Sequence, residues 1–235
     1  VQTVRKADQE ASLKLGFGKN KISLIQWSRQ TKRKFQRGLS VGCGGGRAER
    51  QLINAGICES FHGVDIAEDA IGEARSQAAE AGMNCTYEVA DLNFFDFGND
   101  QYDLIVAQTS LHHIVHLEHV MESLARALIP GGIFWLHDYC GESQFQHTDL
   151  RLSIVNRILA DIPESYRLNL LNNQMVGPVT RRAPGTLISP FESIRSEEIL
   201  PIANRHFTPV KKQMSNSILH LICPVGTRAK FAETE

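Results

Sequence analysis

A glycine-rich turn at residues 42–46 constrains the fold of this chain more than any other feature. The segment Gly38-Leu-Ser-Val-Gly-Cys-Gly-Gly-Gly46 passes from a short apolar run into four glycines, and an amphipathic stretch begins at Arg47. This order predicts a strand, a tight turn and a helix. Glycines allow positive φ angles and close approach of a ligand, and the helix N-terminus points N–H groups at that ligand. A turn without a ligand is the competing interpretation.

Strands and helices are predicted to alternate after this turn. Apolar runs favour strands at residues 38–41, 61–66, 84–90, 102–107 and 133–136. Helical spacing of apolar residues favours helices at 47–55, 68–81 and 117–128. The alternation predicts an α/β protein with a Rossmann-like, doubly wound and mostly parallel sheet. Two further runs, 207–212 and 217–223, predict an antiparallel C-terminal hairpin that brings the sheet to seven strands.

Four segments are expected along the chain. They are a basic helical segment (1–37), a ligand-binding core (38–140), a lid or substrate-recognition insertion (141–200) and the C-terminal hairpin (201–235). The basic segment, with a helix expected over residues 22–35, carries a net charge of +8, against −1 for the whole chain. Such a stretch either guides an anionic partner or forms a solvated helix face.

Composition excludes several classes of protein. The 235 residues are 42% hydrophobic and 22% charged, as in an ordinary globular domain. Apolar runs fall short of the roughly 18 residues that span a bilayer, so no membrane span is expected, and no signal peptide is visible. The five cysteines include no Cys-x-x-Cys pair, which argues against a zinc ribbon or a disulfide framework. The expectation is a cytoplasmic protein with reduced thiols, and its oligomeric state is left open.

Candidate binding residues follow four of the predicted strands. Ligands of such sheets bind at the carboxyl ends of the strands, near the point where strand order reverses. The candidates there are Gly42, Gly44 and Gly46, then Asp65, then Asp91 with Leu92, then Gln108 with Thr109. Asp65 lies 19 residues beyond Gly46, a spacing at which a carboxylate accepts the hydroxyls of a ribose. Each residue alone also fits a strand end or a helix cap.

Two nucleotide-type ligands compete for this arrangement. A dinucleotide fingerprint is Gly-x-Gly-x-x-Gly, and Arg47 stands where its third glycine belongs. The pattern Gly-x-Gly-x-Gly fits residues 42, 44 and 46 instead.

Six ordered motifs resemble those of class I S-adenosylmethionine-dependent methyltransferases of the small-molecule type. They cover residues 38–139 and read Val41–Gly46, Gly63–Ile66, Ala90–Leu92, Tyr102–Val106, Leu111–Ile114 and Leu128–Gly132. The resemblance implies a methyltransferase that uses S-adenosyl-L-methionine.

The resemblance also implies a role for each cofactor-binding residue. The turn with Gly42, Cys43, Gly44 and Gly46 would hold the methionine part, and Asp65 the ribose. Ile66 and Leu92 would flank the adenine, and Asp91 would bond its amino group. The backbone around Ala107 and Gln108, with Thr109 beside it, would meet the methionine ammonium. The family usually has Asp or Glu where this chain has Ser40, so its way of binding the ammonium is in question.

Methyl transfer to a hydroxyl or protonated amine also needs a place for the acceptor's proton. Candidate bases are His112 and His113 after the fourth strand and His137 and Asp138 after the fifth. A Leu-His-His-Ile turn also occurs in this family without a base. His116 and His119 extend the histidines at helical spacing, but no carboxylate-rich partner set is evident and no metal is expected.

The expected acceptor is a small molecule methylated at O or N, in carbohydrate or natural-product biosynthesis. Arg181, Arg182 and Arg195 suit an anionic acceptor, or are solvated residues of an exposed connection. Nucleic acid is disfavoured because no Asn/Asp-Pro-Pro-aromatic run follows the fourth strand. The rival functions are an NAD(P)-dependent oxidoreductase and a non-catalytic S-adenosylmethionine-binding subunit.

Overall fold

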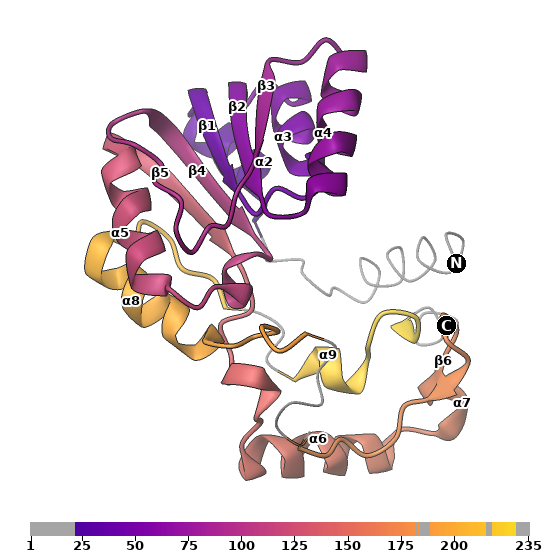
Figure 1. Ribbon diagram of the computed structural model, residues 1–235. Coiled ribbons are helices and arrows are strands. Elements are labelled where there is room, and N and C mark those ends of the chain that lie inside the picture. The colour runs from indigo at the N-terminus through magenta and orange to yellow at the C-terminus, as the bar shows by residue number, and fades with distance from the viewer. Residues whose placement is uncertain (1–21, 182, 184–188, 215–217, 229–235) are drawn as a thin grey trace. The chain divides into compact units, whose positions relative to one another are not determined.

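Two compact units make up the described part of the chain, residues 22–181, 183, 189–214 and 218–228 of the computed structural model (Figure 1). In that part, one unit comprises residues 22–144 and 189–210, and the other lies between residues 145 and 183 and between 211 and 228. The five cysteines, all within the described residues, form no disulfide with one another. Across the described ranges, helices are too short or too polar to cross a membrane.

A parallel sheet forms the centre of the first unit. Its five strands among the described residues have the order β3-β2-β1-β4-β5, and every neighbouring pair is parallel. The strands are β1 (Phe35–Val41), β2 (Cys58–Asp65), β3 (Cys85–Val89), β4 (Tyr102–Gln108) and β5 (Leu128–His137). Strand order reverses between β1 and β4, which is where ligands of such sheets bind. The predicted α/β fold with a mostly parallel sheet is confirmed.

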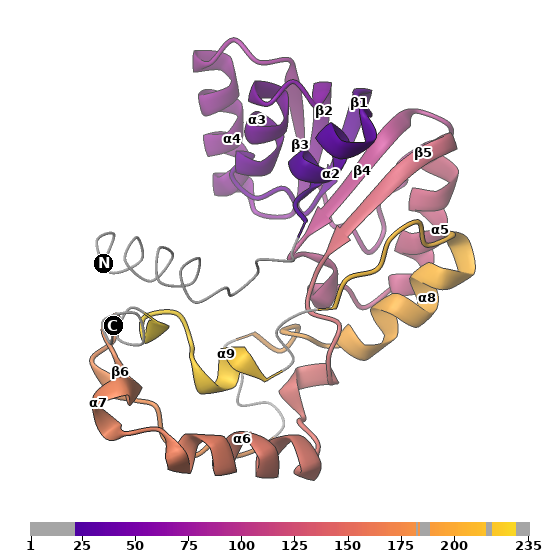
Figure 2. The ribbon, with the colours of Figure 1, turned by 180° about the vertical axis from the view of Figure 1, so that it is seen from behind.

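Helices cover both faces of this sheet (Figures 1 and 2). They are α2 (Leu24–Thr31), α3 (Arg47–Asn54), α4 (Glu68–Glu80), α5 (Leu117–Ala127) and α8 (Ile199–His206). In β4, Ile105 and Ala107 belong to the core shared with α5 and α8, whereas Leu104 and Val106 belong to the core shared with α2 and α3. Burial on both faces explains why the sequence of β4 is a continuous apolar run rather than an alternating one.

The predicted C-terminal hairpin, and with it the seven-stranded sheet, is wrong. Residues 207–214 form no strand, and residues 219–222 form the short helix α9 (Leu219–Ile222). Pro209 has no N–H for a sheet ladder, and Val210 is exposed rather than packed. The predicted turn at residues 215–217 lies outside the described residues. A two-stranded antiparallel pair occurs elsewhere, between β6 (Leu168–Asn169) and β7 (Gln174–Met175).

The helix predicted over residues 22–35 is shorter than expected. Helix α2 begins with a capping box between Ser23 and Gln26 and ends at Thr31, because Lys32 adopts a left-handed conformation with φ 55°. Phe35 already pairs with Cys58 in the sheet. Strand β1 therefore begins three residues before the predicted start, and residues 1–21 of the basic segment lie outside the described part.

The second unit has its own small core. Helix α6 (Asp149–Asp161) is capped by Thr148, and it is followed by α7 (Glu164–Arg167) and the β6–β7 pair. Val155 and Leu159 of α6 pack with Ile222 and Cys223 at the end of α9. The predicted lid role of this region stays a prediction.

Candidate functional site

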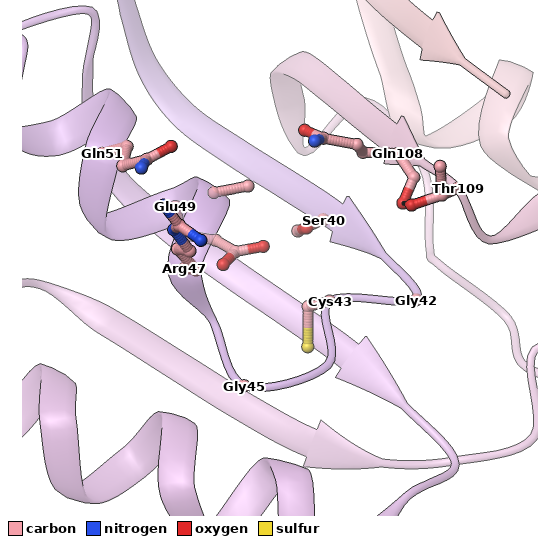
Figure 3. Close-up of a pocket in the computed structure, with 10 residues that line it drawn as sticks. Ser40, Gly42, Cys43, Gly45, Arg47, Glu49, Gln51, Gln108 and Thr109 are labelled. Carbon is pink, nitrogen blue, oxygen red and sulfur yellow. Dashed lines mark hydrogen bonds between the residues drawn. The ribbon is translucent and has the colours of Figure 1, made fainter. Parts of the chain in front are cut away.

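A pocket lies at the reversal point of the sheet, where β1 and β4 end (Figure 3). It has a volume of about 380 Å³ and is formed by the end of β1, the glycine turn, the first turns of α3 and the end of β4. The lining residues are Ser40, Gly42, Cys43, Gly45, Arg47, Ala48, Glu49, Gln51, Gln108 and Thr109. Five of the predicted cofactor-binding residues therefore share one cavity: Ser40, Gly42, Cys43, Gln108 and Thr109.

The glycines of the turn serve different purposes. Gly42, Gly44 and Gly46 all have positive φ angles of 50–68°, which suits glycine and strains other residues. A Cβ atom at Gly42 would lie 2.3 Å from the Ser110 Cβ, and one at Gly46 would lie 2.5 Å from the Tyr87 hydroxyl. A Cβ at Gly44 would meet no atom of the described residues within 4 Å. Packing thus accounts for Gly42 and Gly46, whereas Gly44 leaves open space beside the backbone.

Asp65, at the end of β2, fastens the turn. Its Oδ2 accepts a hydrogen bond from the Gly44 N–H at 2.7 Å, and its Oδ1 accepts one from the Ala67 N–H at 2.9 Å. A carboxylate has about four lone-pair positions, so each oxygen can still accept one bond from a ligand. Asp65 thus holds the turn through two backbone bonds, and ribose binding by Asp65 stays a prediction.

The predicted adenine-side residues lie outside the pocket. Ile66 is 65% exposed directly after β2, whereas Leu92 is buried in the core. The Asp91 Oδ1 accepts bonds from the backbone and side-chain N–H groups of Asn93. Ile66 therefore offers an apolar surface, whereas Asp91 is already engaged in a local turn.

The end of β4 supplies the opposite wall of the pocket. Ala107 is fully buried in the sheet, and Gln108 and Thr109 line the cavity. Thr109 has a positive φ of 54°, an uncommon conformation for a branched residue and one associated with functional sites. The bond from its N–H to the His137 carbonyl, 2.8 Å, fixes this conformation.

Sequence reasoning missed Glu49, the pocket's acidic residue. Glu49 lies in the first turn of α3 and is 0% exposed. Neither of its carboxylate oxygens has a hydrogen-bond partner among the described residues. Burial raises the pKa of Glu49, and the neighbouring Ser40 hydroxyl opposes that rise. A signal was present in the sequence, because Glu49 lies three residues before the buried Leu52 and so on the core-facing side of the helix.

A second buried carboxylate, Asp138, organises the turn after β4. Its side chain is 0% exposed. Its Oδ2 accepts bonds from the backbone N–H groups of Ser110 at 3.0 Å and Leu111 at 2.7 Å. Its Oδ1 bonds the His112 Nδ1 at 2.6 Å and accepts the Tyr139 N–H at 2.8 Å. With four bonds it is placed to position His112 rather than to take a proton itself.

His112 combines partial access with two acidic neighbours. Its side chain is 11% exposed, and its Nε2 lies 3.6 Å from the Glu192 Oε1. Burial lowers the pKa of His112, but the bond and charge of Asp138, together with the charge of Glu192, outweigh burial and raise the pKa from its ordinary value. The ring of His113 packs on that of His112 with centroids 4.0 Å apart, and its Nδ1 lies 3.9 Å from the Glu192 Oε2.

Glu192 was not predicted, because it lies 80 residues along the chain from His112. The bond from the Ile194 N–H to the His112 carbonyl, 3.1 Å, brings the two segments together. A cluster of potential metal ligands results, in which one ring nitrogen each from His112 and His113 and one carboxylate oxygen of Glu192 lie within 4.8 Å of one another. His116 instead packs edge-on against Phe94.

The remaining predicted site residues are placed as follows. His137 ends β5 in register with Gln108. Arg195 donates hydrogen bonds to the carboxylates of Glu118 and Glu198 at 2.6–2.8 Å. Its charge is therefore already paired within the protein, which argues against its binding an anionic acceptor. Arg181 pairs with Asp149 at 2.7 Å in the second unit, and Arg182 lies outside the described residues.

Comparison with known proteins gives the same family as the motifs. Residues 39–132 match the methyltransferase domain family. The ubiquinone biosynthesis O-methyltransferase of Coxiella burnetii is 27% identical over 113 residues, 48% of this chain and 47% of that protein. That of Idiomarina loihiensis is 32% identical over 95 residues, 40% of this chain and 38% of that protein. The chain thus spans about half the length, or less, of these curated relatives.

Solved structures of the same description are also similar. An S-adenosylmethionine-dependent methyltransferase from Mesorhizobium loti is 27% identical, with a TM-score of 0.40, over 48% of this chain and 52% of that chain. Residues 39–132, less than half of the chain, thus match the methyltransferase domain family, and the curated relatives similar to this part of the chain are named O-methyltransferases.

Proposed function

We propose that this protein transfers a methyl group from S-adenosyl-L-methionine to a hydroxyl group of a small molecule. The observation that carries the proposal is the pocket at the β1–β4 reversal point, together with a histidine held by a buried carboxylate in the turn that follows β4. The name of the curated relatives indicates O-methylation in those proteins, and the same reaction suits a site that contains a candidate base. Methylation of an amine is the alternative to this proposal, and an acceptor from carbohydrate or natural-product pathways is a narrower form of it.

The residues fit the cofactor at its methionine end. Open space beside Gly44 accommodates a ligand that a Cβ would obstruct, and Gln108 and Thr109 face the turn across the pocket. Asp65 would hold the ribose with its remaining lone pairs. Ile66 would flank the adenine with its exposed side chain, and Leu92 and Asp91 would complete that side as the family resemblance implies.

S-Adenosylmethionine supplies a methyl group on a positively charged sulfur, and that charge disappears on transfer. The protein therefore needs to position the acceptor and to remove its proton rather than to stabilise a new charge. His112 is the proposed base, because its Nδ1 is held by Asp138. The 3.6 Å between its Nε2 and the Glu192 Oε1 is longer than a hydrogen bond, so Nε2 can still receive the proton of an acceptor hydroxyl. Asp138 fixes the tautomer and orientation of the ring. His113 and Glu192 border the same ring.

Turnover with an acceptor panel tests this function. The protein is incubated with S-adenosylmethionine and catechols, hydroxylated sugars or primary amines, and S-adenosylhomocysteine is quantified by mass spectrometry. We expect product with a hydroxyl acceptor and a fall of about 10²- to 10⁴-fold in His112→Gln. His119→Gln is the matched control, because His119 is exposed on α5.

Three outcomes would contradict the proposal. Binding of a nicotinamide dinucleotide in place of S-adenosylmethionine would identify an oxidoreductase. Cofactor binding without product from any acceptor would identify a non-catalytic subunit. Equal turnover by the wild type and His112→Gln would remove the base from the proposal.

A further inference from the structure

Glu49 is a buried acid whose carboxylate has no hydrogen-bond partner among the described residues, although the Ser40 hydroxyl is its neighbour. More than nine in ten buried polar groups in proteins have a hydrogen-bond partner, and a buried charge is costly unless it is paired. Both carboxylate oxygens of Glu49 lack such a partner within the described residues, although its side chain lines the pocket. The pairing group is therefore expected to come from a molecule in the pocket.

Ser40 explains how a carboxylate from α3 can reach this place. Figure 3 shows Glu49 extending from α3 toward Ser40 at the end of β1. The residue at position 40 is usually Asp or Glu in this family, and a longer acid there would occupy the space near the Glu49 carboxylate. The small Ser40 side chain leaves that space to Glu49, and its hydroxyl is near enough to oppose the rise in the Glu49 pKa. The chain thus retains one acid at this wall and supplies it from a different element.

The charges of the pocket match one part of the cofactor. Arg47 and Glu49 are the charged residues among those that line it, and they have opposite signs. They lie two positions apart in the first turn of α3. An α-amino acid has a cationic amino group and an anionic carboxylate on one carbon, so a site for it requires an acid and a base in the same pocket. A nicotinamide dinucleotide or an acceptor hydroxyl has no such pair of groups.

We propose that Glu49 replaces the missing acid at position 40 and binds the α-amino group of S-adenosylmethionine, with Arg47 facing its carboxylate. This inference rests on the proposed function and assigns to the cofactor site a residue that the family's sequence pattern places elsewhere. In this proposal the small Ser40 side chain leaves space for the Glu49 carboxylate and does not itself bind the amino group.

A binding cycle between protein and ligand tests the assignment. Isothermal calorimetry measures the affinity of S-adenosylhomocysteine and of its desamino analogue, which has hydrogen in place of the α-amino group. A charge-assisted hydrogen bond of this kind corresponds to about a ten- to hundredfold difference in affinity. We expect the wild type to prefer S-adenosylhomocysteine by that factor and Glu49→Gln to bind both ligands equally. Glu59→Gln, an exposed acid on β2, should keep the wild-type preference.

Each other result has a defined meaning. Equal binding of both ligands by the wild type overturns the inference whatever the variant does, and so does an undiminished preference in Glu49→Gln. An equal loss of both ligands in Glu49→Gln assigns Glu49 to the shape of the pocket and also overturns it. A wild type that binds neither ligand at millimolar concentration overturns the proposed function as well, so the two failures are distinguishable.

Discussion

The pocket beside β1 and the turn after β4 each contain a buried carboxylate, and the two are satisfied in opposite ways. Asp138 receives bonds from three backbone N–H groups and one imidazole. Glu49 receives none from the described residues. A carboxylate with a full set of partners stabilises the folded chain, whereas one without partners costs free energy until a ligand supplies them. The first builds the site and the second is available to bind.

The largest expected effect comes from removing the satisfied carboxylate. Asp138→Ala leaves the N–H groups of Ser110 and Leu111 without their acceptor and frees His112. We expect the free energy of unfolding to fall by about 3 kcal/mol or more, measured by urea denaturation. Asp161→Ala, at the exposed end of α6, should change it by less than about 0.5 kcal/mol. Similar values for both variants would show that the four bonds contribute little.

The glycine turn allows a second comparison, between packing and ligand space. An alanine at Gly42 adopts a strained φ and meets the Ser110 Cβ, whereas an alanine at Gly44 has only the strained φ. We expect losses of about 2–4 kcal/mol for Gly42→Ala and about 1 kcal/mol for Gly44→Ala. Gly44→Ala should nevertheless weaken S-adenosylhomocysteine binding in calorimetry. Equal stability losses would refute the packing difference, and undiminished binding would refute the role of Gly44.

Removing the unsatisfied carboxylate should have the opposite sign. Glu49→Met keeps a similar side-chain volume and removes a buried carboxylate that has no hydrogen bond to the described residues. We expect the free energy of unfolding of the ligand-free protein to rise by about 1 kcal/mol, again by urea denaturation. A loss of 1 kcal/mol or more would mean that Glu49 is paired in the folded chain, and the comparison with Asp138 would then fail.

The smallest expected effect is a shift in the titration of His112. Its pKa is raised from the ordinary value of a histidine because Asp138 and Glu192 favour the charged ring. Asp138→Asn removes the larger of these influences while burial still favours the neutral ring, so the pKa should fall. Neutral His112, the form that can accept a proton, would then predominate from a lower pH. NMR titration of the ring measures this, and the same pKa in both proteins would remove Asp138 as the cause.

The sequence predicted those elements of the fold that local patterns of consecutive residues specify. The apolar run of β4 and the glycines after β1 were sufficient for the sheet and for the position of the turn. The hairpin over residues 207–223 failed, because an apolar run becomes a strand only where a partner strand is available. Residues 219–222 pack in the second unit as a helix instead.

The difference between Asp138, which has hydrogen-bond partners, and Glu49, which has none among the described residues, could not be predicted from local patterns. Asp138 depends on contacts with residues 26–28 positions earlier in the chain, and Glu192 reaches His112 from the segment before α8. Glu49 had a signal in its spacing from Leu52, but its lack of partners is a property of the folded core. Such three-dimensional satisfaction of polar groups leaves no local pattern in a sequence.

Thermal unfolding of the wild type and Glu49→Met, with and without S-adenosylhomocysteine, tests the central claim most directly. Without ligand, Glu49→Met should unfold at the higher temperature, because it has no unpaired acid. With ligand well above its dissociation constant, the wild type should gain stability by mass action and overtake the variant, which gains little. If the ligand raises both unfolding temperatures equally, or neither, Glu49 is not the group that the ligand completes.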